Sequence, residues 1–150
     1  MLNKTILLLL ICFLVSCGYK PLYLKKDTID IPIINWEFEG DRKINKIFAS
    51  QLKAVRKTST AKGYEVKLNS QKLLEVVSKD KNGDPSMYRT SLIVNFELIE
   101  NDIVIRQREF NANFTYNNNK NKFELKQYQK SIEGNLINEI VEKIFIFLKS

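Results

Sequence analysis

Histidine is absent from the 150-residue sequence, which also has only two cysteines, three prolines and five glycines. Without histidine, the chain lacks the usual general base, the commonest metal ligand and any serine–histidine arrangement. It contains no Gly-x-Ser-x-Gly elbow, phosphate-binding loop or dinucleotide fingerprint, and its acidic residues are scattered among lysines. We therefore expect no enzymatic activity, no metal site and no cofactor.

Long apolar runs are also missing, with one exception near the N-terminus. Residues 6–15 are wholly apolar, and Lys4 supplies a small basic region before them. This run is too short for a membrane span, which needs roughly 20 residues, but it has the size of a signal-peptide core. We expect residues 1–16 to be a signal peptide.

The signal peptide is followed by a pattern suited to lipid attachment. Leu14-Val15-Ser16-Cys17 resembles the lipobox of bacterial lipoproteins, in which a small residue precedes the cleavage site. The Cys17 thiol can carry a diacylglycerol through a thioether. We expect cleavage after Ser16, a covalent lipid on Cys17 as the one attached group, and a tether over residues 17–28. Because Cys12 leaves with the signal peptide, no internal disulfide is expected.

The formal net charge is +7, which suggests an anionic partner such as nucleic acid, phospholipid headgroups or phosphorylated lipopolysaccharide. Secretion argues against nucleic acid. The chain is also rich in lysine, asparagine and isoleucine together, as AT-rich coding would produce. The charge therefore permits an anionic partner without requiring one.

Residues 29–150 carry the periodicities of a folded domain. β-Branched and aromatic residues predict a first strand over 29–38, in which Pro32 indicates an edge position or a bulge. Asp41 is suited to be the N-cap of an amphipathic helix over 42–57. Alternating patterns then predict strands over 64–76, 88–98 and 103–116.

The connections between these strands carry their own signals. Asn82-Gly83 predicts a tight hairpin turn. In the last strand the apolar parity switches, so we expect a β-bulge near residues 106–109, the alternative being that both faces of the strand are partly covered there. After an Asn-rich loop, a long C-terminal helix is expected, with Gly134 placed where it would approach the sheet. The order predicts an α+β two-layer sandwich, with a mostly antiparallel four-stranded sheet and two helices on one face.

The start of the mature chain, Cys17-Gly18-Tyr19-Lys20-Pro21-Leu22-Tyr23, resembles that of the lipopolysaccharide-assembly lipoprotein family, LptE. The element order and the Tyr-x-x-x-Leu-x-Val-Asn run at residues 88–95 extend the resemblance over residues 29–150. It implies an outer-membrane lipoprotein that plugs and helps assemble an LptD-type β-barrel and binds lipopolysaccharide during its export. Gly18, where an Asp would resemble an inner-membrane retention signal, favours the outer membrane.

The resemblance also implies that basic residues at one end of the sheet bind the glycolipid. Lys81, beside the predicted hairpin turn, and Lys120 or Lys122, in the Asn-rich loop, are the matching positions, and lysine suits phosphate as a point charge. Ordinary solvated lysines are the alternative. Two other functions also remain open: a docking lipoprotein of another envelope complex, and a carrier with a ligand pocket between sheet and helices.

Overall fold

The computed structural model describes residues 31–52 and 63–150. They form β1 (Ile33–Gly40), α2 (Arg42–Leu52), β2 (Tyr64–Lys79), β3 (Pro85–Glu100), β4 (Ile103–Asn117) and α3 (Lys122–Lys149). The predicted signal peptide, Cys17 and the tether lie outside the described residues. So do the beginning of the predicted first strand and the last turn of the predicted helix over 42–57.

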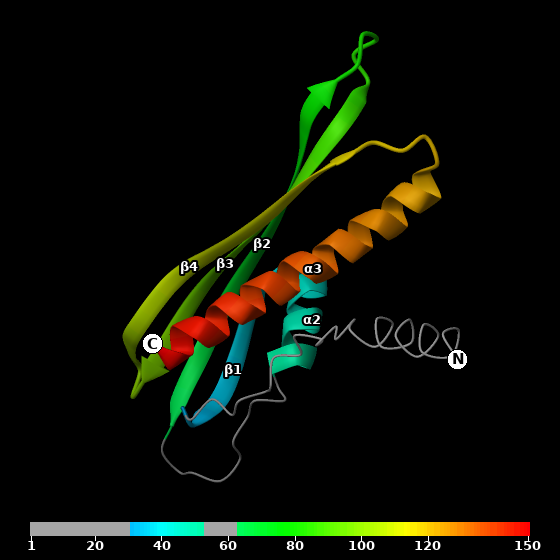
Figure 1. Ribbon diagram of the computed structural model, residues 1–150. Coiled ribbons are helices and arrows are strands. Elements are labelled where there is room, and N and C mark those ends of the chain that lie inside the picture. Colours follow the sequence, from blue (N-terminus) through cyan, green and yellow to red (C-terminus); the bar gives the residue numbers. More distant parts are fainter. Residues whose placement is uncertain (1–30, 53–62) are drawn as a thin grey trace, which may run out of the picture.

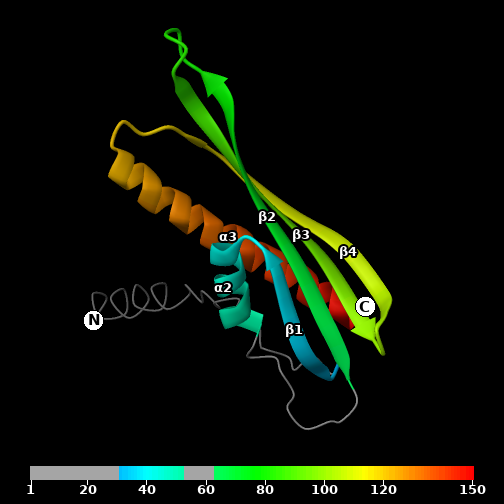
Figure 2. The same cartoon turned by 180° about the vertical axis from the view of Figure 1, so that it is seen from behind.

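The four strands make one mixed sheet in the order β1-β2-β3-β4. β1 pairs with β2 in parallel, whereas the β2–β3 and β3–β4 pairs are antiparallel. Both helices lie on the same face of the sheet (Figures 1 and 2). The predicted element order and α+β class are confirmed. Pro32 lies just before the edge strand β1, where its carbonyl accepts a hydrogen bond from Tyr64 N at 2.8 Å.

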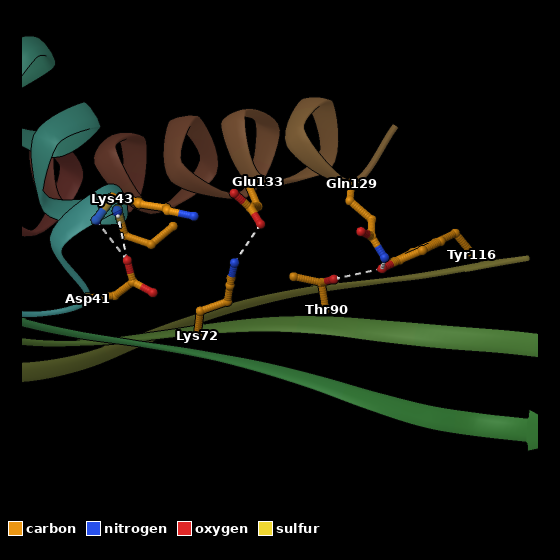
Figure 3. Close-up of polar contacts among 8 residues, drawn as sticks. Asp41, Lys43, Lys72, Thr90, Tyr116, Gln129 and Glu133 are labelled. Carbon is orange, nitrogen blue, oxygen red and sulfur yellow. Dashed lines mark hydrogen bonds and ion pairs between the residues drawn. The ribbon is translucent and has the colours of Figure 1, made fainter. Parts of the chain in front are cut away.

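β1 ends at a glycine because the chain turns sharply there into α2. Gly40 has φ +90°, and a Cβ at this position would lie 2.0 Å from the carbonyl oxygen of Ser70. That carbonyl accepts a hydrogen bond from Asp41 N at 2.9 Å. The Asp41 carboxylate then accepts from the backbone N–H groups of Lys43 and Ile44 (Figure 3), which confirms Asp41 as the N-cap. Beyond this turn, β2 continues without β1.

The hydrophobic core fills the space between the sheet and the helices. Alternate positions of the strands point toward the helices, so one face of each strand is apolar. The largest fully buried side chains come from both layers: Ile33, Ile44, Phe48, Leu52, Val66, Leu68, Leu92, Val94, Phe96, Ile137, Ile140 and Ile144. A packed core at this place argues against a ligand carrier whose pocket lies between sheet and helices.

The two hairpins use different turns. Asn101 and Asp102 both have positive φ, 50° and 63°, and they directly join β3 to β4, as in a type I′ turn. At the β2–β3 connection, only Gly83 has positive φ. There the Asp80 carboxylate accepts hydrogen bonds from Asn82 N and Asp84 N, so the loop is longer than the tight turn predicted.

Two local expectations concern β4 and α3. The register of β3 and β4 shifts so that Leu98 faces Arg106 and Ile99 faces Val104. The extra residue is therefore Ile105, directly before Arg106, which confirms a bulge near residues 106–109. The second expectation needs correction. Gly134 does not approach the sheet, because a Cβ there would meet no atom within 4 Å. Its place in α3 has no packing reason among the described residues.

Candidate ligand cleft at the distal end of the sheet

The distal end of the sheet is the end where β2 stops, β3 begins and β4 stops. Met87 of β3 pairs with Asn117 of β4. The next residue, Asn118, donates from its backbone N–H to Ser86 O at 2.8 Å and from its side-chain amide to Pro85 O at 2.7 Å. These bonds fix the path of the loop that leads from β4 into α3.

The N-terminus of α3 is closed by asparagines of this loop. The Asn121 side chain accepts from the backbone N–H groups of Phe123 and Glu124, as an N-cap does. The Glu124 carboxylate in turn accepts from the side-chain amides of Asn119, at 2.9 Å, and Asn121, at 3.0 Å. A carboxylate in the first turn is also favoured by the helix dipole. The sequence predicts only a polar loop by composition here, although an Asn three residues before a Glu is a cap signal.

An open cleft of about 910 Å³ lies between the end of β4 and the start of α3, and we call it the distal cleft. Its apolar lining residues are Met87, Phe114, Tyr116, Leu125 and Tyr128. Its polar lining residues are Thr115, Asn117, Asn118, Asn119, Lys120 and Glu124. Lys120 is the one cation among these lining residues. The cleft therefore offers apolar surface beside one lysine, Lys120, and one carboxylate, Glu124, whose oxygens accept hydrogen bonds from Asn119 and Asn121.

The inner wall of the distal cleft is held in place by a polar chain across three elements. The Tyr116 hydroxyl lies 3.2 Å from the Thr90 hydroxyl of β3 and accepts a hydrogen bond from the Gln129 amide of α3 at 2.9 Å (Figure 3). The Tyr116 ring also meets the Tyr128 ring edge-on, with 5.8 Å between centroids. These contacts position the aromatic wall before any ligand arrives.

The three predicted lysines lie at the same end of the sheet but do not converge on one point. Lys120 lines the distal cleft, and Lys122 is the first residue of α3. Lys81 lies in the loop at the tip of the β2–β3 hairpin, which projects beyond the start of α3 (Figure 1). All three side chains are exposed. None of them forms an ion pair with a residue that the structure describes.

Two aromatic residues of the distal cleft have the sequence periodicity of core residues. Phe114 shares the strand parity of buried Phe110 and Tyr116, and Tyr128 shares the helix face of Leu125 and Ile132. Yet Phe114 is 45% exposed and Tyr128 is 49% exposed. Here the end of β4 and the first turns of α3 meet through Tyr116, Tyr128 and Gln129, but neither element fully covers the other. Strand and helix periodicity identify the face of a residue but not whether that face is covered.

The described residues show no other arrangement for chemistry. Within residues 31–52 and 63–150, no group of acidic residues could hold a metal ion. Neither of the two described helices is long and apolar enough to cross a membrane. We take the distal cleft as the candidate site, because its lining combines apolar and polar side chains suited to binding.

No family model matches the sequence, and no curated protein matches it either. The fold, however, is one found in solved structures of bacterial lipoproteins. Lipoprotein B from Nitrosomonas europaea superposes with a TM-score of 0.62 and 9% identity, covering 85% of this chain and 92% of that one. A minor lipoprotein from Acinetobacter baumannii gives 0.60 and 13% identity, with coverage of 79% and 90%.

A third solved structure shares the fold. Rare lipoprotein B from Shewanella oneidensis superposes with a TM-score of 0.53 at 9% identity, covering 73% of this chain and 92% of that one. At such low identities these likenesses establish the shared fold. They agree with the lipoprotein signal read from residues 14–17, which is an independent observation.

Proposed function

We propose that this protein is an outer-membrane lipoprotein of the LptE type, anchored by a lipid on Cys17. It plugs an LptD-type β-barrel, helps that barrel assemble, and binds lipopolysaccharide during export to the cell surface. The run from Cys17 to Tyr23, Gly18 after the lipidated cysteine, and the shared lipoprotein fold support this proposal. The barrel, the glycolipid and the inner leaflet of the outer membrane are its expected partners.

The distal cleft is the observation that carries the ligand part of the proposal. Lipopolysaccharide joins phosphorylated sugars to acyl chains, so its binding site needs a cation beside apolar surface. Lys120 lies beside the exposed rings of Phe114 and Tyr128 in this cleft. Lys81, at the hairpin tip, would meet a second anionic group farther along the same end. Since the described residues hold no catalytic cluster, the glycolipid is bound and released unchanged.

The dimensions of the domain suit a plug. α3 has 28 residues, which at 1.5 Å per residue is about 42 Å. A bilayer with its headgroups is about 40–45 Å thick. The sheet runs alongside α3 and makes the domain elongated (Figures 1 and 2). A body of this length would fill a large barrel across the membrane.

Charge reversal at Lys81 and Lys120 tests whether these residues bind lipopolysaccharide. In the purified lipoprotein, Lys81→Asp with Lys120→Asp should weaken binding of lipopolysaccharide several-fold, with an unchanged unfolding midpoint, because both side chains are exposed and unpaired among the described residues. Lys43→Asp with Lys46→Asp, two exposed positions on α2, gives the same change in net charge away from the cleft. Lys122→Asp, measured separately, decides whether the third lysine contributes. Wild-type affinity in the Lys81–Lys120 double variant would remove both residues from the site.

Co-purification tests the plug. A C-terminally tagged protein, recovered from mild-detergent extracts of its own membranes, should bring down a large β-barrel at close to one-to-one stoichiometry. Recovery of another envelope complex instead would favour the docking-lipoprotein alternative and overturn the barrel proposal. The lysine experiment is independent of this result, since it uses the purified protein alone.

A further inference from the structure

β2 has a free edge where it extends beyond β1. The last β1 pairing is Gly40 with Ser70, and the Ser70 carbonyl on this side is bonded to Asp41 N. Backbone groups point to alternate sides along a strand, so those of Lys72, Leu74 and Val76 point to the same edge. No described strand lies there. A register shift after Val76 ends the regular stretch, so the free edge comprises residues 71–76.

This free edge is apolar on both faces of the sheet. Leu74 is 55% exposed and Val76 is 45% exposed, and both lie on the helix-side face with buried Val66, Leu68 and Ser70. Leu73, on the opposite face, is 37% exposed. α3 packs on β3 and β4 rather than on β2, which leaves these side chains uncovered, and the hairpin tip beyond them projects past the start of α3 (Figure 2). A strand added at this edge would cover apolar side chains on both faces.

The other edge of the sheet is formed by β4, and two features hinder the addition of a strand there. β4 carries its bulge at Ile105, and bulges disrupt edge pairing. The Lys143 ammonium group of α3 also donates to the carbonyl of Asn111 in β4 at 2.8 Å. On the β2 edge, Lys72 is instead drawn toward α3 by its ion pair with Glu133 at 2.7 Å (Figure 3).

A second copy of this chain fits the free edge poorly. In the antiparallel register that places Leu74 opposite Val76 of the second copy, the two Glu75 carboxylates face each other. Like charges directly opposite each other destabilise a strand pair. In the register that pairs Leu74 with Leu74 of the second copy, Glu75 instead lies opposite Leu73. The first register is therefore disfavoured by charge, and the second leaves the Glu75 carboxylate without a cation opposite it.

Glu75 also indicates what the partner carries. It lies opposite Arg89 in the β2–β3 ladder, but Arg89 donates to the Thr115 hydroxyl at 3.3 Å. Glu75 has no ion pair within the described part of the chain, and it is exposed. A cation arriving on the free-edge side would meet this carboxylate directly.

We propose that residues 71–76 of β2 accept an extended segment of a partner protein as an additional strand of the sheet. The segment carries β-branched or aromatic residues opposite Leu74 and Val76, and Lys or Arg opposite Glu75. Backbone hydrogen bonds supply affinity, and the Glu75 contact supplies register and selectivity. This proposal depends neither on the barrel nor on the glycolipid.

A designed peptide serves as the probe. Acetyl-Thr-Val-Lys-Val-Ile-Thr-amide, carrying a fluorophore, places Lys opposite Glu75 and apolar residues opposite Leu73, Leu74 and Val76 when it runs antiparallel to β2. Fluorescence anisotropy with the full-length lipoprotein in detergent micelles measures its affinity. The matched control peptide has Glu in place of Lys, and we expect it to bind at least tenfold more weakly. Equal binding of both peptides, or binding of neither, would overturn the proposal.

Two variants locate the contact. Glu75→Lys should reverse the preference between the two peptides without altering the core. Leu74→Pro removes an N–H that points to the free edge, where proline is tolerated, and should abolish binding, whereas Leu74→Val should retain it. If sedimentation instead showed a dimer that Leu74→Pro dissociates, with no peptide bound, the occupant would be a second copy and the proposal would be wrong.

Discussion

Lys72 and Glu133 join the free half of β2 to the middle of α3, with 2.7 Å between the ammonium nitrogen and the carboxylate oxygen. The two residues are 61 positions apart in the chain, and both side chains are largely shielded, at 29% and 20% exposure. This pair is a direct side-chain contact between α3 and β2. Beyond it, β2 carries only exposed or half-exposed side chains.

A double-mutant cycle should measure this tie. With Lys72→Met and Glu133→Gln, alone and together, we expect a coupling of about 0.5–1 kcal/mol in the free energy of unfolding by urea. The Lys143–Glu139 pair, spaced i,i+4 on α3 and more exposed, is the matched comparison and should give about 0.3–0.5 kcal/mol. A coupling no larger than that comparison would show that shielding adds nothing.

The asparagine cap of α3 gives a second prediction. Asn121→Ala should lower the free energy of unfolding by about 1 kcal/mol, because the N–H groups of Phe123 and Glu124 lose their acceptor. Asn121→Asp should preserve stability, since a carboxylate accepts the same bonds and suits the helix dipole. Asn113→Ala, at an exposed β4 position, is the control and should change little. Equal losses at both asparagines would argue against the cap.

Two glycines should respond in opposite directions to the same substitution. Gly134→Ala should raise the free energy of unfolding by up to about 1 kcal/mol, the cost of glycine in a helix interior, because its new methyl group meets no atom within 4 Å. Gly40→Ala should destabilise strongly, because φ is +90° and the methyl group would collide with the Ser70 carbonyl. Thermal melts of the two variants suffice, and a loss at Gly134 would reveal a contact with residues outside those described.

Lys67 should titrate at higher pH than an ordinary lysine. Its hydrogen bond to Glu39, and then the charge of Glu39, raise its pKa above the ordinary 10.5, with 2.8 Å between the groups. A raised pKa means that the stabilisation is complete below pH 10.5 and is lost as pH rises through the folded-state value. Glu39→Gln should lower the pKa of Lys67, followed by NMR of its side chain. Glu65→Gln, which removes a carboxylate that does not act on Lys67, should leave it unchanged.

Much of the fold could be predicted because periodicity reports which side of an element is buried. The even-numbered positions of β3 from Thr90 to Leu98 are buried, as their alternation indicated. The switch of parity in β4 located a bulge to within a residue of Ile105. Asp41 could be recognised because an N-cap needs only its own side chain and the following N–H groups.

The candidate site was harder to predict because it depends on where elements stop covering one another. Phe114 and Tyr128 read as core residues by spacing, and only the divergence of β4 from α3 exposes them. The parallel pairing of β1 was equally hidden, since it is formed between segments that a helix separates. For the lysines, sequence could place Lys81 and Lys120 at one end, but not the cleft that contains only the second.

The β2–β3 hairpin projects beyond the start of α3, and the length of its two arms sets how far its tip extends. Side chains alternate faces with a period of two, so inserting or deleting two residues in each arm preserves which side chains face α3. The tip bearing Lys81 would then advance or retreat by about 7 Å, while the core residues keep the faces that they have now. The distance between the tip and the distal cleft can therefore change independently of the stability of the fold.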